Sequence, residues 1–125
     1  MKKLQLIILL LSVFAIFSCK KNGFGGSSGV SGIVSHHGKP IPDATIYIKF
    51  NAKDFPGEDL SVYDGKVYSN SNGYYEITNF YQGDYYLYAI GYDYAISAPY
   101  VVDGGLSVSL GSKERKDVDI PVGEE

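Results

Sequence analysis

Short segments in which apolar and polar residues alternate recur along the chain after Ser28, and turn-forming residues separate them. Residues 44–48, 85–90 and 106–110 show this period of two, which places successive side chains on opposite faces of a strand. No segment after Ser28 keeps the i, i+3, i+4 apolar spacing of an amphipathic helix. The 12 tyrosines and 15 glycines agree with this, because Tyr favours strands and Gly favours turns. The pattern predicts an all-β domain.

The expected strands are short and numerous. Further strands are expected at residues 30–34, 62–63, 67–68, 75–77, 96–102 and 118–122, with a tight turn at Asp64-Gly65 and a surface loop over residues 51–59. Seven or eight short strands in a body of under ~100 residues are typical of a single antiparallel β-sandwich. The side chains expected to point into its core are those of Val34, Ile46, Ile48, Tyr75, Ile77, Tyr85, Leu87, Val118 and Ile120.

The first 18 residues have the form of an export signal. Lys2 and Lys3 supply a positive start, and residues 4–17 are apolar except for Gln5 and Ser12. The apolar run is shorter than the roughly 20 residues that a spanning helix needs, and it ends at a small residue, Ser18. We therefore assign residues 1–18 to a cleaved signal peptide and leave them out of the fold.

The signal ends at the only cysteine of the chain, Cys19. Residues 16–19 read Ile-Phe-Ser-Cys and resemble the lipobox of bacterial lipoproteins, although Phe17 is bulkier than the usual residue. The resemblance implies that Cys19 carries acyl chains and anchors an exported protein to the bacterial cell membrane or outer membrane. An ordinary signal peptide followed by an unmodified cysteine is the alternative. Gly and Ser dominate residues 20–28, so residues 19–28 are predicted to be a lipidated cysteine with a flexible tether.

Charge and cysteine content exclude some classes of protein. The formal charge is −3, and removal of Lys2 and Lys3 from the 11 basic side chains leaves nine against 14 acidic ones, or −5. Without a basic cluster in the body, the chain lacks the electrostatic footprint of a nucleic-acid-binding protein. A single cysteine cannot form an internal disulfide, so the fold must rest on its apolar core.

Three blocks of the body match a known family in order and spacing. They are residues 32–34 with 38–46 (Gly-Lys-Pro-Ile-Pro-Asp-Ala-Thr-Ile), residues 69–77 (Ser-Asn-Ser-Asn-Gly-Tyr-Tyr-Glu-Ile), and residues 83–87 (Gly-Asp-Tyr-Tyr-Leu). Together they resemble the carboxypeptidase regulatory-like domains, over residues 29–123. The resemblance implies a transthyretin-like β-sandwich used as a non-catalytic accessory or adhesive module. It suggests fold more than function, because one fold hosts many functions.

No catalytic, metal or cofactor site is expected. Cys19 is committed to lipid, so no nucleophile with a matching base can be assembled, and the chain is not expected to be an enzyme. His36 and His37 lack a Glu three residues on, and adjacent strand positions point to opposite faces, which argues against a shared metal. The acids near residues 54–64 match no calcium loop, and a charged, solvated loop is the preferred interpretation.

Three tyrosines are the candidate binding residues. Tyr47, Tyr86 and Tyr88 fall on outward positions of strands that are neighbours in the transthyretin-like topology. Exposed aromatic patches mark binding surfaces, whereas cross-strand tyrosine pairs also serve simply to stabilise a sheet. The predicted function is a membrane-anchored binding or adhesion module of the cell envelope that recognises protein or glycan. The alternative is a structural spacer or accessory subunit of an envelope complex with no small ligand.

Overall fold

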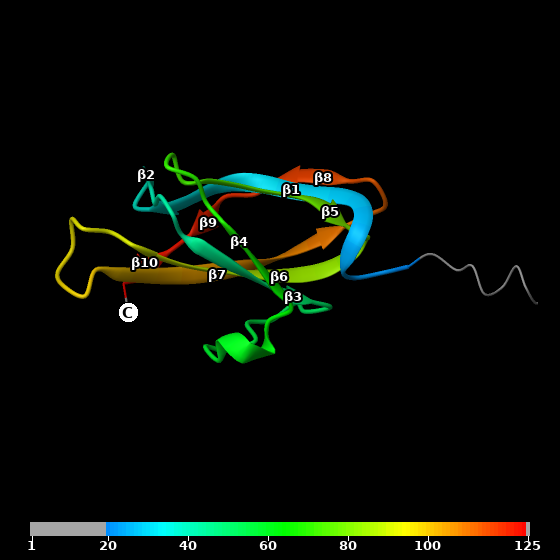
Figure 1. Ribbon diagram of the computed structural model, residues 1–125, viewed down its shortest axis with the longest axis horizontal. Helices are drawn as coiled ribbons and strands as arrows, with labels where there is room; N and C mark the ends of the chain where they lie inside the picture. The colour runs from blue at the N-terminus through cyan, green and yellow to red at the C-terminus, as the bar shows by residue number, and fades with distance from the viewer. Residues whose placement is uncertain (1–19, 125) are drawn as a thin grey trace, which may run out of the picture.

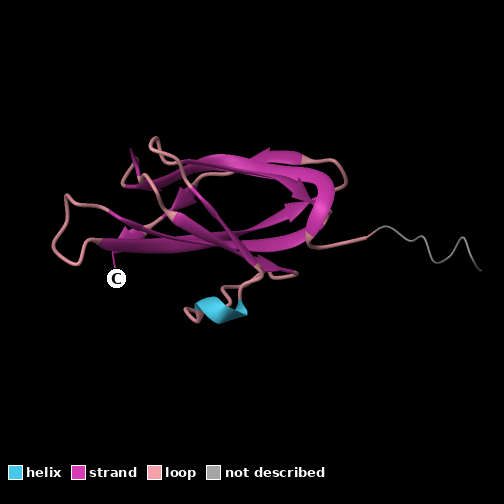
Figure 2. Cartoon of the chain, in the orientation of Figure 1, coloured by secondary structure: helices cyan, strands magenta, loops and turns pink. Residues whose placement is uncertain are grey.

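Two five-stranded sheets pack face to face in the computed structural model, which describes residues 20–124 (Figure 1). Cys19 and the predicted signal peptide lie outside the described residues. Strands make up most of the described chain, and its one helical element is a short 3₁₀ turn, η1, Leu60–Val62 (Figure 2). Within residues 20–124, no helix has the length and apolar character needed to cross a bilayer. The predicted all-β sandwich is confirmed.

The first sheet is built around its longest strand, β1 (Phe24–His36). Antiparallel partners are β2 (Lys39–Pro40) and β5 (Tyr74–Phe80). Of the strand expected at residues 118–122, only β9 (Ile120–Pro121) forms, and two further short strands flank that segment, β8 (Arg115–Asp117) before it and β10 (Gly123–Glu124) after it. Both β8 and β9 run parallel to β1, so the sandwich is not purely antiparallel.

The second sheet has the order β10-β7-β6-β3-β4 and is antiparallel throughout. Its other strands are β3 (Thr45–Phe50), β4 (Gly65–Tyr68), β6 (Gly83–Tyr92) and β7 (Val101–Leu110). In the register, Leu87 of β6 lies between Ile48 of β3 and Leu106 of β7. The strong alternation in β3 and β6 therefore places one set of side chains between the sheets and the other set on the outer face.

The core lies between the two sheets and contains the residues predicted for it. Phe80 of β5 and Tyr85 of β6 stack across it with ring centroids 3.9 Å apart. Every residue of the expected inward set is buried except Val118, which is partly exposed. Val118 sits in the short crossing between β8 and β9, where its N–H donates to the Ser31 carbonyl at 2.6 Å.

The N-terminal segment is more ordered than its composition predicts. β1 begins at Phe24, so residues 24–28, which we assigned to the tether, belong to a strand. A Cβ on Gly26 would lie 2.3 Å from the Phe80 carbonyl oxygen, so this glycine allows close backbone contact rather than free motion. Phe24 stacks on Phe80 with a centroid distance of 5.5 Å. Of the described residues of the predicted tether, residues 20–23 precede the strand.

Two further expectations about strands are wrong. Asp64 does not make a hairpin turn, because its N–H donates to Ile48 O and its carboxylate accepts from Phe50 N, which ties it to the end of β3. The segment before Asp64 forms η1 instead of a strand. Residues 93–100 form a loop with a turn in which Tyr100 N donates to Ser97 O, and β7 begins only at Val101.

Candidate functional site

The outer face of the second sheet carries the three candidate tyrosines. Tyr47 of β3 lies directly opposite Tyr88 of β6 in the register, and Tyr86 is two positions along β6 on the same face. Strands β3 and β6 are neighbours, as the sequence analysis expected. The alternation of β6, with Tyr85, Leu87 and buried Ala89 on the inner side, brings these tyrosines together.

The loop between β3 and β4 folds back over this face (Figure 1). The ring centroid of its Tyr63 lies 5.8 Å from that of Tyr47. The Tyr63 ring also stacks on the Tyr88 ring, with a centroid distance of 5.9 Å. The ring centroid of its Phe55 lies 5.0 Å from that of Tyr88 and 5.8 Å from that of Tyr86. We call these five side chains the aromatic face. The loop leaves Tyr88 only 4% exposed, so the expectation that Tyr88 is a solvent-facing side chain is wrong, while Tyr47 and Tyr86 stay half-buried.

Specific hydrogen bonds hold the loop in this position. The Tyr63 hydroxyl donates to the Gly57 carbonyl at 2.8 Å, and Asp59 accepts from Ser61 N at 3.1 Å at the start of η1. The Ser61 hydroxyl and N–H lower the pKa of Asp59. Lys49 Nζ lies 3.3 Å from the Asp64 carboxylate. Asp59 therefore stabilises the turn within the loop, and Asp64 attaches the loop to β3.

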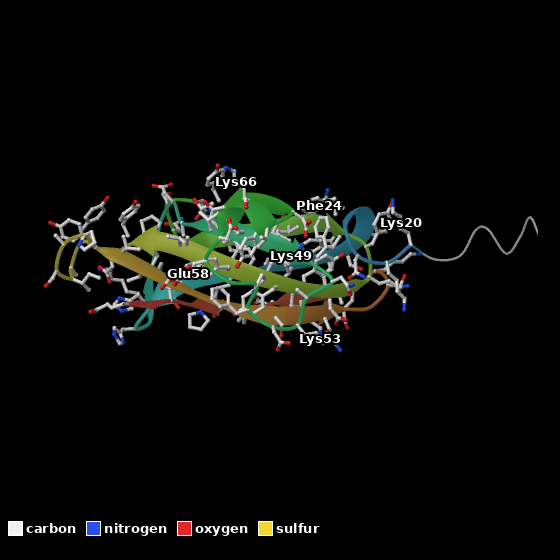
Figure 3. All side chains as sticks on the ribbon, turned by 90° about the horizontal axis from the view of Figure 1, so that it is seen from below. Lys20, Phe24, Lys49, Lys53, Glu58 and Lys66 are labelled. Carbon is white, nitrogen blue, oxygen red and sulfur yellow. The ribbon has the colours of Figure 1, made fainter. Side chains whose placement is uncertain are left out.

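A hollow of about 210 Å³ opens beside the aromatic face. Figure 3 looks onto this side of the molecule and labels Glu58, one of the lining side chains. The Tyr88 hydroxyl donates to Asp103 Oδ2 at the wall of the hollow. The complete lining is Phe55, Glu58, Tyr86, Tyr88, Asp103, Gly104 and Gly105.

Gly105 lines the hollow without contributing a side chain. It lies opposite Tyr88 in the register of β6 and β7. A Cβ on Gly105 would lie 2.7 Å from the Tyr86 ring and 2.5 Å from the Leu87 carbonyl oxygen. Any side chain at this position would displace the Tyr86 ring, so the glycine is needed for the shape of the hollow.

The chemistry of the hollow is that of a neutral aromatic surface next to carboxylates. Burial raises the pKa of Tyr86, and burial followed by the charge of an ionised Tyr86 raises the pKa of Tyr63 to about 12. Both hydroxyls are therefore protonated at neutral pH. Asp103 and Glu58 offer acceptor oxygens. The lining has flat apolar rings and hydrogen-bond acceptors, but contains no histidine, lysine, serine or cysteine.

Sequence reasoning found part of this site. Tyr47, Tyr86 and Tyr88 do meet on one face, although Tyr47 does not line the hollow. Phe55, Glu58 and Asp103 were missed. The available signal was Phe55, the one aromatic residue in the otherwise polar segment 51–59.

Comparisons with known proteins support the fold. No protein-family model matches the chain, and no curated protein matches it. The sandwich is similar to a crystal structure of a proposed carbohydrate-binding protein from Pseudomonas aeruginosa, with a TM-score of 0.59 and 11% identity over 80% of this chain and 91% of that one. It is also similar to a DUF3823 family protein from Parabacteroides merdae, with a TM-score of 0.49 and 13% identity over 78% of this chain and 46% of that one.

Proposed function

We propose that this protein is a non-catalytic, lipid-anchored module of the bacterial cell envelope that binds a glycan in the hollow beside the aromatic face. The observation that carries the proposal is the lining itself, in which Phe55 and Tyr86 stand next to the carboxylates of Glu58 and Asp103. Phe55 is 48% exposed, so its ring is available to a ligand. The carboxypeptidase regulatory-like resemblance, with its accessory or adhesive role, is part of this proposal.

The lining fits the two surfaces of a sugar ring. The C–H face of a pyranose is apolar and packs on an aromatic ring, and its hydroxyl edge donates hydrogen bonds to carboxylate oxygens. The bond from Tyr88 to Asp103 fixes the orientation of that carboxylate before a ligand arrives. A volume of about 210 Å³ lies below the roughly 300–1,000 Å³ of sites that enclose a drug-sized ligand, which suits one or two residues of a longer glycan.

The structural neighbour from Pseudomonas aeruginosa adds support of a different kind. It is described as a proposed carbohydrate-binding protein and shares the fold across most of both chains. At 11% identity the likeness concerns the fold, and the choice of glycan over protein as ligand rests on the chemistry of the lining.

Replacing Tyr86 or Phe55 with alanine should weaken glycan binding. The test is an array of bacterial and host polysaccharides probed with the full chain in detergent. Loss of one stacking ring should reduce apparent affinity for a bound glycan about tenfold, which corresponds to ~1.4 kcal/mol. Tyr92→Ala is the matched control, because Tyr92 lies on the same strand, is 52% exposed and is outside the hollow. Equal binding by all four proteins would remove the hollow as the site.

The spacer alternative is favoured by one observation, the burial of Tyr88 beneath the loop. In that case the aromatic face serves only to fasten the β3–β4 loop to the sheet. Absence of any bound polysaccharide, combined with a lower melting temperature for Phe55→Ala, would favour the spacer over the glycan-binding module. Normal melting with selective loss of binding would favour the module.

Membrane attachment through Cys19 is the second part of the proposal. The motivation is a lone cysteine directly after a short apolar run. Wild-type protein should partition into the membrane fraction, and Cys19→Ala should not, since two or more acyl chains hold a protein stably on a bilayer. Intact mass spectrometry of the mature wild type should show acyl chains on Cys19. Recovery of unacylated mature protein entirely in the soluble fraction would contradict the anchor.

A further inference from the structure

Four titratable side chains meet at the C-terminal end of β1, next to β2 (Figure 1). His36 is the last residue of β1, and Asp93 directly follows β6. Glu124 is the last residue of β10. His37 completes the group, with its ring centroid 4.2 Å from that of His36. This cluster shares no residue with the lining of the hollow.

The two histidines lie together because the strand ends between them. We expected adjacent positions to point to opposite faces, which holds only while the backbone stays extended. His37 has φ of 50°, in the left-handed region, and begins the turn to β2. Its side chain therefore lies next to that of His36. The expectation that the two histidine side chains point to opposite faces is wrong.

Asp93 sets the orientation and tautomer of His36. Both side chains are buried, and His36 Nδ1 lies 2.8 Å from Asp93 Oδ2. The other carboxylate oxygen of Asp93 accepts from Lys39 Nζ at 2.7 Å and from Ala95 N at 3.0 Å. Because the Asp93 carboxylate also accepts from Lys39 Nζ and Ala95 N, His36 Nδ1 is the donor in this pair, and Nε2 is the ring nitrogen left for another partner.

His36 Nε2 and a carboxylate oxygen of Glu124 are separated by nearly the distance between two ligands of one metal ion. Nε2 lies 3.8 Å from Glu124 Oε1, which is too long for a hydrogen bond. Two ligands of one tetrahedral metal, each bound at about 2.0–2.1 Å, stand roughly 3.3–3.5 Å apart. One ligand atom each from His36, His37 and Glu124 lies within 4.8 Å of the others. His37 and Glu124 are exposed, so small rotations of their side chains would close the remaining distance.

We propose that His36 Nε2, His37 and Glu124 form a binding site for a divalent transition metal, with Zn²⁺ as the best fit. Two imidazoles and one carboxylate suit Zn²⁺, whereas Mg²⁺ and Ca²⁺ prefer all-oxygen ligands. Asp93 is a positioning residue, since it fixes His36 through Nδ1 as carboxylates do for metal-binding histidines. Three protein ligands leave a fourth position open to water or to a donor group on a partner.

The site would add a link between β10 and the end of β1 to the existing bond from Val122 N to Ser35 O. β10 is a two-residue strand whose register partners are Asp103 and Val102 of β7. A metal held by Glu124 together with the two histidines would tie β10 to the end of β1. Metal binding should therefore raise the melting temperature, because a ligand that binds only the folded state stabilises it.

The test is calorimetric titration of Zn²⁺ into the full chain, purified in detergent without a histidine tag. One ion should bind per chain, and His37→Ala and Glu124→Gln should each weaken binding about tenfold or more. Both substituted residues are exposed, so these variants should keep the fold. Glu76→Gln is the matched control, an exposed carboxylate on β5 outside the cluster. Zn²⁺ binding of equal strength in all variants, or absence of one-to-one binding, overturns the proposal.

A second measurement separates ligand from positioning roles. Co²⁺ in place of Zn²⁺ should give the visible absorption bands of a four-coordinate ion, and these should change in His37→Ala and Glu124→Gln but not in Glu76→Gln. Asp93→Asn should weaken Zn²⁺ binding about 10–100-fold while keeping the band pattern, because all three ligands remain. Unchanged affinity in a folded Asp93→Asn protein overturns the positioning role. Unchanged Co²⁺ spectra in both ligand variants overturn the assigned ligands.

Discussion

Replacing Leu87 with alanine is expected to lower the free energy of unfolding by about 2–5 kcal/mol. Leu87 is 0% exposed at the middle of β6, the central strand of its sheet, and lies between Ile48 and Leu106 in the register. The substitution removes buried methyl groups and leaves a cavity that the flanking strands cannot fill without bending. Denaturant unfolding of the full chain, followed by circular dichroism, measures the loss.

Tyr86→Ala is the control for this prediction. Tyr86 is the preceding residue, faces the opposite side of the sheet and is half-buried, so its removal should cost clearly less. Tyr88→Ala should cost more than its outer-face position suggests, because the loop covers this ring. Equal losses for Leu87→Ala and Tyr86→Ala would mean that the register of β6 is wrong, since a slip of one residue exchanges the two faces.

Replacing Gly32 with alanine is expected to lower the free energy of unfolding by about 3 kcal/mol or more, which is a large part of the stability of a small domain. A Cβ on Gly32 would lie 1.9 Å from the Val118 carbonyl oxygen and 2.5 Å from the Val118 carbonyl carbon. Overpacking usually costs ~1–3 kcal/mol, and here the obstacle is backbone, which no rotamer change relieves. The crossing between β8 and β9 would have to move away from β1 and give up the bond from Val118 N to Ser31 O.

The control for Gly32 is another glycine of the same domain. A Cβ on Gly123 would meet no atom within 4 Å, and its φ is not in the left-handed region, so Gly123→Ala should leave the melting temperature nearly unchanged. Thermal melts by circular dichroism compare the two variants with wild type. If Gly32→Ala melts like Gly123→Ala, the close crossing of the Val118 segment over β1 is refuted.

The parts of the fold that sequence predicted well are those in which a local pattern decides the structure. In β3 and β6 the sequence places inward and outward residues alternately, so both the strands and their inner faces could be predicted directly. The core residues Ile46, Leu87 and Ile120 followed from the same period of two. The outward group of Tyr47 and Tyr86 followed once β3 and β6 were taken as neighbours.

The parts that were missed depend on contacts between distant segments. Nothing local to Tyr88 reveals that Phe55 and Tyr63 cover it, because the β3–β4 loop has no period. The glycines before Ser28 suggested a flexible chain, but Gly26 is a glycine because Phe80 leaves no room for a Cβ. Similarly, the parallel pairing of β8 with β1 joins residues that are 86 positions apart in the sequence, such as Gly29 and Arg115. Propensity carries no information on such pairings.

The early start of β1 has a mechanical consequence. Asn22 N donates to Gln82 O, its side chain accepts from Asp84 N, and Gly23 bonds the Tyr85 hydroxyl, so the entering chain is fastened to the beginning of β6. The same strand carries Tyr86 and Tyr88 at the hollow. If Cys19 holds the anchor, tension from a captured glycan passes along one strand and through these bonds toward the membrane.

A load carried instead by the covalent chain that follows Gly23 enters β1 and meets a second set of bonds. β1 is hydrogen-bonded to β5 on one side and to β8 and β9 on the other. A pull along its axis loads those bonds in shear, so that many must break together instead of opening one pair at a time. Forced unfolding is governed by the unfolding barrier, and simultaneous rupture makes that barrier high. The doubly paired first strand is thus suited to resist a pull along its own axis.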